Sequence, residues 1–183
     1  MSRIRTSVGN ALATQMIDYV HWEAHKGCLN TVSHVSTGLA STKSANYLIQ
    51  TPTKEVHWKA HVSVNGPCRV RLWETPVLTA GTTLAVTSGT VLETINLNRN
   101  FTTSAATVVY HGPTLTTSSS GKQLFEIFLG NSATTANKDI VGGQARGHSE
   151  WIMATTQTYL ITVANQAGVT VNMSLDAEFY EEG

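Results

Sequence analysis

Hydrophobic and polar residues alternate along the last part of the chain, GVTVNMSLDAEFYEEG (168–183). In an extended chain, side chains at every second position point to the same side. Six apolar residues would therefore share one face: Val169, Val171, Met173, Leu175, Ala177 and Phe179. The opposite face is polar and carries Tyr180 near its end. This pattern predicts a β-strand with one face in a core and the other outside it.

A second stretch of alternation surrounds the turn sequence formed by Asn65, Gly66 and Pro67. Apolar residues occupy every second position of 58–64 before the turn and of 68–72 after it. Asn and Gly tolerate the positive φ angles that tight turns require. We therefore predict a β-hairpin with one face in the core.

Further short strands are predicted by the same period of two. They cover 82–86, 90–98, 106–112, 122–130 and 157–165. Short strands at these intervals, separated by turn residues, are typical of an antiparallel β-sandwich or jelly roll. We therefore expect an all-β fold, in which only 150–157 and the N-terminus carry weak helical patterns.

The N-terminal segment, residues 1–27, differs from the rest of the chain, and we expect it to form an arm on a sandwich domain of residues 28–183. A short helix over Ala13–Glu23 and an extended arm that packs on a neighbouring subunit are both open, and a frayed terminus is the third alternative. A disordered tail would have no reason to carry the apolar residues found here. These are Ile17, Tyr19, Val20 and Trp22.

Two segments are predicted to be loops. TTSSSGK (116–122) is a short tip, and residues 130–149 are rich in Gly, Ala, Asn and Thr. Loops as long as the second are usually functional or mobile in compact domains, so 130–149 is a candidate contact region.

The composition supports a β-protein with a weakly charged surface. The chain contains 27 threonines, whose β-branched side chains suit pleated sheets. Charged residues make up 13%, and 12 basic residues balance 12 acidic ones. A balanced charge argues against binding to nucleic acid, which requires a clustered positive field. It is compatible with self-association.

Two cysteines, Cys28 and Cys68, occur in the chain. The first residues lack the apolar core of a secretory signal, so we expect reduced thiols, although a disulfide between the two stays possible. An uninterrupted apolar run of 18 residues is absent from the sequence, so we expect no membrane partner.

Candidate metal and histidine sites are weak. His21, Glu23 and His25 resemble a chelating patch, but the order of residues is not that of a zinc protease, and no third ligand follows at a natural spacing. His57 and His61 share one strand face and would lie about 13 Å apart, which is too far for one ion. We expect the latter pair to be surface or interface histidines.

Candidate catalytic groups are equally weak. The stretch GHSEW (147–151) lacks the second glycine of a nucleophile elbow. Glu181 and Glu182 are expected to be solvated, whereas a glycosidase acid requires a shielded site. We therefore expect a protein that is not an enzyme, with no catalytic residue, no cofactor and no metal.

The aromatic residues offer one further alternative, which is a platform on which sugars could stack. Trp58 and Tyr159 are in phase with apolar neighbours and are expected in the core. Trp73 is out of phase with its neighbours, so Trp73 and Trp151 are the candidates for a carbohydrate-binding surface.

Several segments together resemble a type of tailed-bacteriophage β-rich virion protein, most closely a capsid decoration (cement) protein. They are NLNRN (96–100), VVYHGPTLT (108–116), the Gly pair 142–143 before EWIMATTQTYLITVAN (150–165), and LDAEFYEE (175–182). The resemblance covers residues 30–183 and contains no catalytic signature.

This resemblance implies a structural role on the outside of a virion that is assembled in the host cytoplasm. The implied partners are the major capsid protein and further copies of the chain, as a homotrimer, and a neck, tail or fibre-base protein is the alternative. The candidate contact residues are Ile17, Tyr19, Val20, Trp22, Trp73, Arg99, Arg146 and Tyr180.

Overall fold

The structure is a computed structural model of the 183-residue chain. It describes residues 2–8, 11–17, 19–75, 77–79, 82–83, 89–102, 104–113, 121–130 and 150–182.

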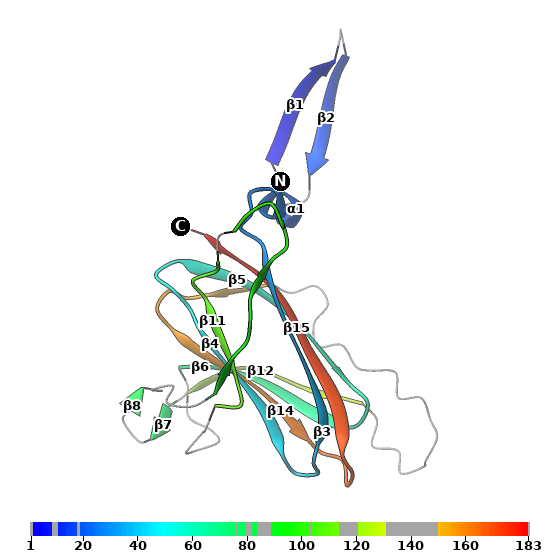
Figure 1. Ribbon diagram of the computed structural model, residues 1–183, viewed down its shortest axis with the longest axis vertical. Coiled ribbons are helices and arrows are strands. Elements are labelled where there is room, and N and C mark those ends of the chain that lie inside the picture. Colours follow the sequence, from blue (N-terminus) through cyan, green and yellow to red (C-terminus); the bar gives the residue numbers. More distant parts are fainter. Residues whose placement is uncertain are drawn as a thin grey trace.

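Two antiparallel sheets pack face to face and form the body of the protein (Figure 1). The five-stranded sheet has the order β10 (Ile95–Asn96), β3 (Asn30–Leu39), β15 (Val171–Glu182), β5 (Glu55–Val64) and β13 (Trp151–Met153). The six-stranded sheet has the order β12 (Lys122–Leu129), β6 (Cys68–Glu74), β14 (Thr158–Asn165), β4 (Ser44–Gln50), β11 (Val108–His111) and β9 (Thr90–Val91). The expectation of an all-β antiparallel sandwich is confirmed.

The C-terminal strand lies at the centre of the five-stranded sheet, between β3 and β5. Val171, Met173, Leu175, Ala177 and Phe179 are all buried, as the alternation predicts. Val169 precedes the strand and is 68% exposed, so it does not belong to the core face. β15 pairs with neighbours on both sides along most of its length, which explains why the sandwich requires it.

The predicted hairpin around Asn65, Gly66 and Pro67 is wrong. β5 pairs with β15 and β13 in one sheet, whereas β6 pairs with β12 and β14 in the other. The turn therefore carries the chain from one sheet to the other. Alternation gives no information on which strands pair, since both inner faces of a sandwich have the same period.

Three such sheet-to-sheet turns lie together at the end of the sandwich away from the N-terminal strands (Figure 1). They connect β3 to β4, β5 to β6, and β14 to β15. Asn165 ties the first of these turns to the last. Its Nδ2 donates to the carbonyls of Leu39 and Val169, each at 2.9 Å, and its Oδ1 accepts from the Ala167 N–H at 2.7 Å.

Asn65 and Asn172 connect the remaining turn to β15. The Asn172 N–H donates to Asn65 Oδ1 at 2.7 Å, and the Asn65 N–H donates to the Asn172 carbonyl at 3.1 Å. Asn172 Oδ1 also accepts from the Gly38 N–H at 3.0 Å. Side-chain amides thus satisfy backbone groups that the turns leave outside the ladders.

Other strand predictions are confirmed in part. β11, β12 and β14 lie within the predicted ranges 106–112, 122–130 and 157–165. The range 90–98 holds two short strands in different sheets, β9 and β10, in place of one continuous strand. Residues 150–157 contain strand β13, so the helical reading is wrong there.

β3 and β4 lie in a part of the chain where the alternation predicts no strand. In 82–86 only the short β8 (Thr82–Thr83) is described, and it pairs with β7 (Val77–Thr79). The predicted loop 130–149 lies outside the described residues apart from Gly130, and so does most of 116–122.

The N-terminal segment forms a hairpin followed by a short helix. β1 (Ser2–Val8) pairs antiparallel with β2 (Ala11–Ile17), in a register that runs from Ser2 opposite Ile17 to Val8 opposite Ala11. Helix α1 (Tyr19–His25) follows. The predicted helix over Ala13–Glu23 is therefore wrong in its first part, where the chain is a strand.

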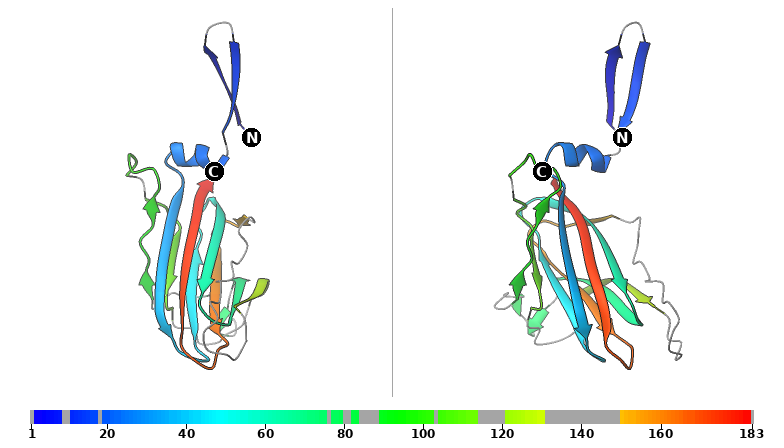
Figure 2. Two further views of the ribbon diagram at one scale, coloured as in Figure 1. Left: turned by 90° about the vertical axis from the view of Figure 1, so that its right-hand side faces the viewer. Right: turned by 45° about the vertical axis from the view of Figure 1, so that its right-hand side comes forward.

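The arm hairpin (β1 and β2) extends away from the sandwich, and α1 lies at its base (Figures 1 and 2). The C-terminus lies at the same end of the body, close to α1 (Figure 2). The two strands pair only with each other among the described strands. Both outer edges of this hairpin therefore have backbone groups outside any described ladder.

Candidate functional site

The base of the arm is held to the sandwich by the NLNRN sequence. Asn96 Nδ2 donates to the carbonyl of Gly27 at 2.6 Å, and Asn98 Nδ2 donates to the carbonyl of His25 at 3.3 Å. The last carbonyls of a helix have no partner within the helix. The two asparagines supply donors at the end of α1, so they fix the helix to the strand that follows β9. We call residues 19–27, which include α1, together with residues 96–101 the arm mount.

The same asparagines set the shape of their own loop. The Asn98 N–H donates to Asn96 Oδ1 at 2.9 Å, and the Asn100 N–H donates to Asn98 Oδ1 at 3.2 Å. Such side-chain to backbone bonds two residues apart replace a backbone turn. The sequence NLNRN therefore has a local structural purpose, because each of its first two asparagines bonds both its own loop and the arm.

Gly27 ends the helix in a left-handed conformation, with φ of +74°. This position favours glycine because a Cβ atom costs energy there. A Cβ built on Gly27 would also lie 2.3 Å from Cγ of Phe101, whose ring covers the glycine. The mount therefore depends on close packing at this residue as well as on hydrogen bonds.

Glu23 points into the base of the mount and is only 3% exposed. Its Oε1 lies 3.0 Å from Nζ of Lys26, which is three residues further along the chain and directly follows α1. The hydrogen bond to Glu23 raises the pKa of the Lys26 ammonium. Burial, and then the charge of Glu23, raise the pKa of the Cys28 thiol. Among the described side chains, no group of three His, Cys, Asp or Glu residues is arranged to hold a metal ion.

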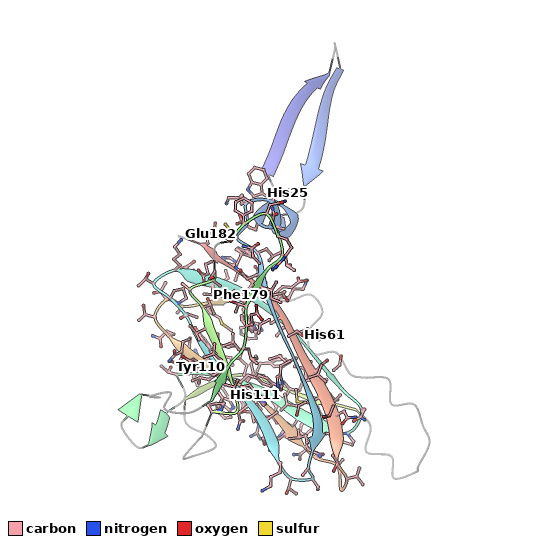
Figure 3. All side chains as sticks on the ribbon, in the orientation of Figure 1. His25, His61, Tyr110, His111, Phe179 and Glu182 are labelled. Atoms are coloured by element: carbon pink, nitrogen blue, oxygen red, sulfur yellow. The ribbon has the colours of Figure 1, made fainter. Side chains whose placement is uncertain are left out.

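A cluster of polar side chains, which we call the His57 cluster, lies beside the C-terminus on the same end of the sandwich. His57 Nδ1 lies 3.0 Å from Oε1 of Glu150 and 2.8 Å from the Tyr180 hydroxyl, and His57 Nε2 lies 3.1 Å from Oε2 of Glu182. The His57 and Tyr180 rings stack with centroids 4.4 Å apart. The cluster ties β15 to β5 and to the residue before β13. Figure 3 shows Glu182 and His25 at this end of the molecule.

Among the described residues, the His57 cluster consists of carboxylates, an imidazole and a phenol, and no described serine, threonine or cysteine is bonded to His57. Sequence reasoning missed it because its members come from distant parts of the chain. The pairing of Tyr180 with His57 across β15 and β5 could have been found only from the strand register.

The candidate contact residues fall into three groups. The backbone places Ile17 at the end of β2, and Tyr19 and Val20 at the start of α1. Trp22 is half-buried in α1, and Arg99 is exposed on the mount loop. These five residues are brought together at the base of the arm.

The other candidate contacts lie elsewhere. Tyr180 is 4% exposed, and its ring stacks on that of His57. The ring therefore packs within the sandwich and has little surface that a partner could contact. Trp73 packs beside Leu48 and Leu160 on the outer face of the six-stranded sheet. Arg146 lies outside the described residues.

The two tryptophans considered for sugar binding do not share a surface. Trp73 belongs to β6 in the six-stranded sheet, whereas Trp151 belongs to β13 in the five-stranded sheet. Trp151 packs against the main core and meets the edge of the Phe125 ring at 6.5 Å between centroids. The pair therefore forms no common platform.

Large apolar side chains are exposed on the arm mount and directly before it. Leu97 is 43% exposed and Phe101 42%, and both belong to the mount loop, whereas Ile95, which precedes it, is 40% exposed. Val91 is 57% exposed but lies in β9, which pairs with β11 in the other sheet. Exposed apolar side chains that lie close together are candidates for an interaction site.

Cys28 and Cys68 are free thiols, so the possible disulfide is absent. Cys28 adjoins the mount, whereas Cys68 is fully buried at the start of β6, opposite Asn165. The described part of the chain contains no helix with the length and apolar character needed to cross a membrane.

Comparisons of this chain with protein-family models, with curated proteins and with solved structures find no match.

Proposed function

We propose that the protein is a non-enzymatic structural component of a tailed-phage virion, which decorates and stabilises the outside of the capsid. Its partners on this proposal are the major capsid protein and further copies of the chain, as a homotrimer. The observation that carries the proposal is the arm: a two-stranded hairpin that leaves the sandwich and is fixed at its base by Asn96 and Asn98.

An isolated two-stranded hairpin is marginally stable in water. Its open edges also present unpaired backbone groups, which are a template for pairing with another chain. A hairpin that projects from a well-packed body is therefore best explained by a second surface that receives it. The exposed side chains of Ile95, Leu97 and Phe101 lie on the arm mount or directly before it and would extend such a contact.

The experiment compares binding to shells assembled from the capsid protein of the same virion. Three proteins are used: the full chain, a variant that lacks residues 2–17, and the double variant Asn96→Ala, Asn98→Ala. We expect the full chain to cosediment with shells, the deletion to lose binding, and the double variant to bind more weakly. Gln166→Ala is the control, because Gln166 is exposed at the opposite end of the sandwich.

Circular dichroism of the deletion variant must retain the β-spectrum, since the arm hairpin pairs with no described strand of the body. Full occupancy of shells by the folded deletion variant would refute the role of the arm. Failure of the full chain to bind any shell would refute the decoration role.

The alternative position in a neck, tail or fibre base is distinguished by copy number in the particle. A decoration protein is present in as many copies as the shell lattice requires, whereas a neck protein forms a single ring. The carbohydrate-binding alternative would use Trp73 or Trp151, both of which are half-buried. Binding on a glycan array that is lost on mutation of either tryptophan to alanine would favour it.

A further inference from the structure

One side of the sandwich is closed by a segment that crosses between the sheets. We call residues 90–96 the strap, because they begin as β9 in the six-stranded sheet and end as β10 in the five-stranded sheet. Between the two strands, the Leu92 N–H donates to the Val109 carbonyl at 2.8 Å. The strap ends at Asn96, which bonds to Gly27 in the arm mount.

Two histidines from different sheets meet on this side of the sandwich. His34 comes from β3, and His111 comes from the end of β11, where it lies opposite Thr90 of the strap. Their rings stack with centroids 3.9 Å apart and an angle of 29° between planes. Figure 3 labels His111 and Tyr110, both from β11, in the part of the body away from the arm.

Tyr47 of β4 completes the contact. Its hydroxyl lies 2.9 Å from His34 Nδ1, and its ring centroid lies 5.3 Å from that of His111. The hydroxyl satisfies the neutral imidazole, since it can donate to an unprotonated Nδ1. Burial raises the pKa of Tyr47 to about 12, so this hydroxyl keeps its proton at neutral pH.

The environment of the two imidazoles disfavours positive charge. Burial lowers the pKa of His34, and the neighbouring His111 lowers it further. Burial also lowers the pKa of His111. Two like charges at the distance of this stack would repel each other with little water between them.

The elements packed around the pair offer no described carboxylate to compensate that charge. On β15, Leu175 lies opposite His34, and Asp176 is on the outer face with its Oδ1 bonded to Ser33. On the strap, Glu93 is exposed. On β4 and β11, the titratable groups near the pair are Tyr47 and Tyr110, and Tyr110 packs against Leu48 and Leu160 on the outer face.

We propose that His34 and His111 form an acid-sensitive joint between the two sheets, which is closed while both rings are neutral and opens when they are protonated. Opening separates β3 from β11 on the strap side of the sandwich. Because the strap leads into Asn96, the change also reaches the arm mount. Acidification thus loosens the hold of the body on its arm.

The pH dependence has a defined sign. In the unfolded chain the two histidines have the ordinary pKa of about 6.5, whereas in the folded chain their pKa values are lowered. The unfolded chain therefore binds more protons than the folded chain as the pH falls through the ordinary value. The contribution of His34 and His111 to stability is therefore fully present above this pH. It is lost progressively on acidification, until the folded rings are also protonated.

The test measures the thermal midpoint of the full chain between about pH 7.5 and about pH 5, a range that spans ordinary histidine titration. His111→Gln removes the second charge and keeps a polar side chain. We expect this variant to lose at most half as much in thermal midpoint on acidification as the unaltered protein. His25→Gln, an exposed histidine of α1, is the matched control and should lose as much as the unaltered protein.

A second readout applies to the unaltered protein, so that it does not depend on the folding of a variant. The ring protons of His34 and His111 are followed by NMR during titration, together with the Leu92 amide of the strap. We expect both rings to titrate below the ordinary histidine value of about 6.5, and the Leu92 amide to lose protection in the same range after correction for intrinsic exchange. Rings that titrate at or above that value, or equal losses of thermal midpoint in all three proteins, would overturn the proposal.

Discussion

Replacement of Asn165 tests how the sandwich is closed at the end away from the arm. Asn165 is 1% exposed, and its side-chain amide makes three hydrogen bonds, to Leu39, Val169 and Ala167. Asn165→Ala removes all three. The Leu39 carbonyl lies in a buried residue, whereas Val169 is 68% exposed and its carbonyl can bind water.

The expected loss follows from these differences. A buried backbone group left without a partner costs about 1–3 kcal/mol, and a hydrogen bond that water can replace contributes about 0.5–1.5 kcal/mol. One buried group left without a partner and two bonds that water can replace together give an expected loss of about 2–6 kcal/mol in the free energy of unfolding for Asn165→Ala. For a chain of this size, each kcal/mol lowers the thermal midpoint by about 2–4 °C, so the expected shift is roughly 4–24 °C.

The assay is thermal unfolding followed by circular dichroism, with urea unfolding as an independent measure. Gln166→Ala is the control at the next position, and since Gln166 is exposed we expect a change within about 0.5 kcal/mol. Asn165→Asp sharpens the test, because it places a carboxylate oxygen against the carbonyls of Leu39 and Val169. It should destabilise at least as much as Asn165→Ala. An Asn165→Asp protein as stable as the unaltered one would refute the assigned hydrogen bonds.

Three further predictions concern the arm mount, the core and the buried tyrosines. Gly27→Ala should cost at least about 1–2 kcal/mol because of the positive φ at this position, and we expect faster proteolysis at the arm mount. Addition of Phe101→Ala should partly restore the resistance to proteolysis. Equal rates of cleavage in the single and double variants would contradict the packing of Phe101 on Gly27. Phe179→Ala removes a fully buried ring whose centroid lies 5.2 Å from that of Trp58. We expect the free energy of unfolding, measured with urea, to fall by about 3–5 kcal/mol. A fall of less than about 1 kcal/mol would contradict the assigned packing. Burial raises the pKa of Tyr47 to about 12, so its contribution to stability is lost as the pH rises from about 10 to about 12. Burial also raises the pKa of Tyr159, so absorbance titration should detect late tyrosinates from Tyr47 and Tyr159. Ionisation of all five tyrosines near their ordinary pKa would exclude this.

The sandwich could be predicted where one face of a strand is apolar and the other polar. β15 follows this rule, and the predicted range 157–165 also matches β14 closely, although Leu160 of β14 is buried on the outer face. β3 did not, because its inward positions include His34 and Ser36, and polar residues there interrupt the apolar period. β4 does not alternate either, because Tyr47, Leu48 and Ile49 follow one another and are all buried. Leu48 points to the outer face, where a separate apolar cluster covers it.

The sites were harder to predict because they depend on pairing between distant segments. The His57 cluster joins residues 57, 150, 180 and 182, and the acid-sensitive joint joins His34 to His111 across two sheets. A period of two assigns each residue to a face of its strand, but it does not determine which strand lies opposite. NLNRN is recognisable as a motif in the sequence, but only the fold shows that Asn96 and Asn98 donate hydrogen bonds to residues at the base of the arm.

The position of β3 has a mechanical consequence. This strand follows directly from the arm mount and lies inside the five-stranded sheet, where it pairs with β15 from Asn30 opposite Phe179 to Leu39 opposite Val171. A force that draws the arm away from the body acts along the axis of β3. Ladder hydrogen bonds between antiparallel strands are perpendicular to that axis, so they bear the load together in shear and do not break one after another. The arm can therefore transmit tension to the centre of the sandwich without peeling a strand from its edge.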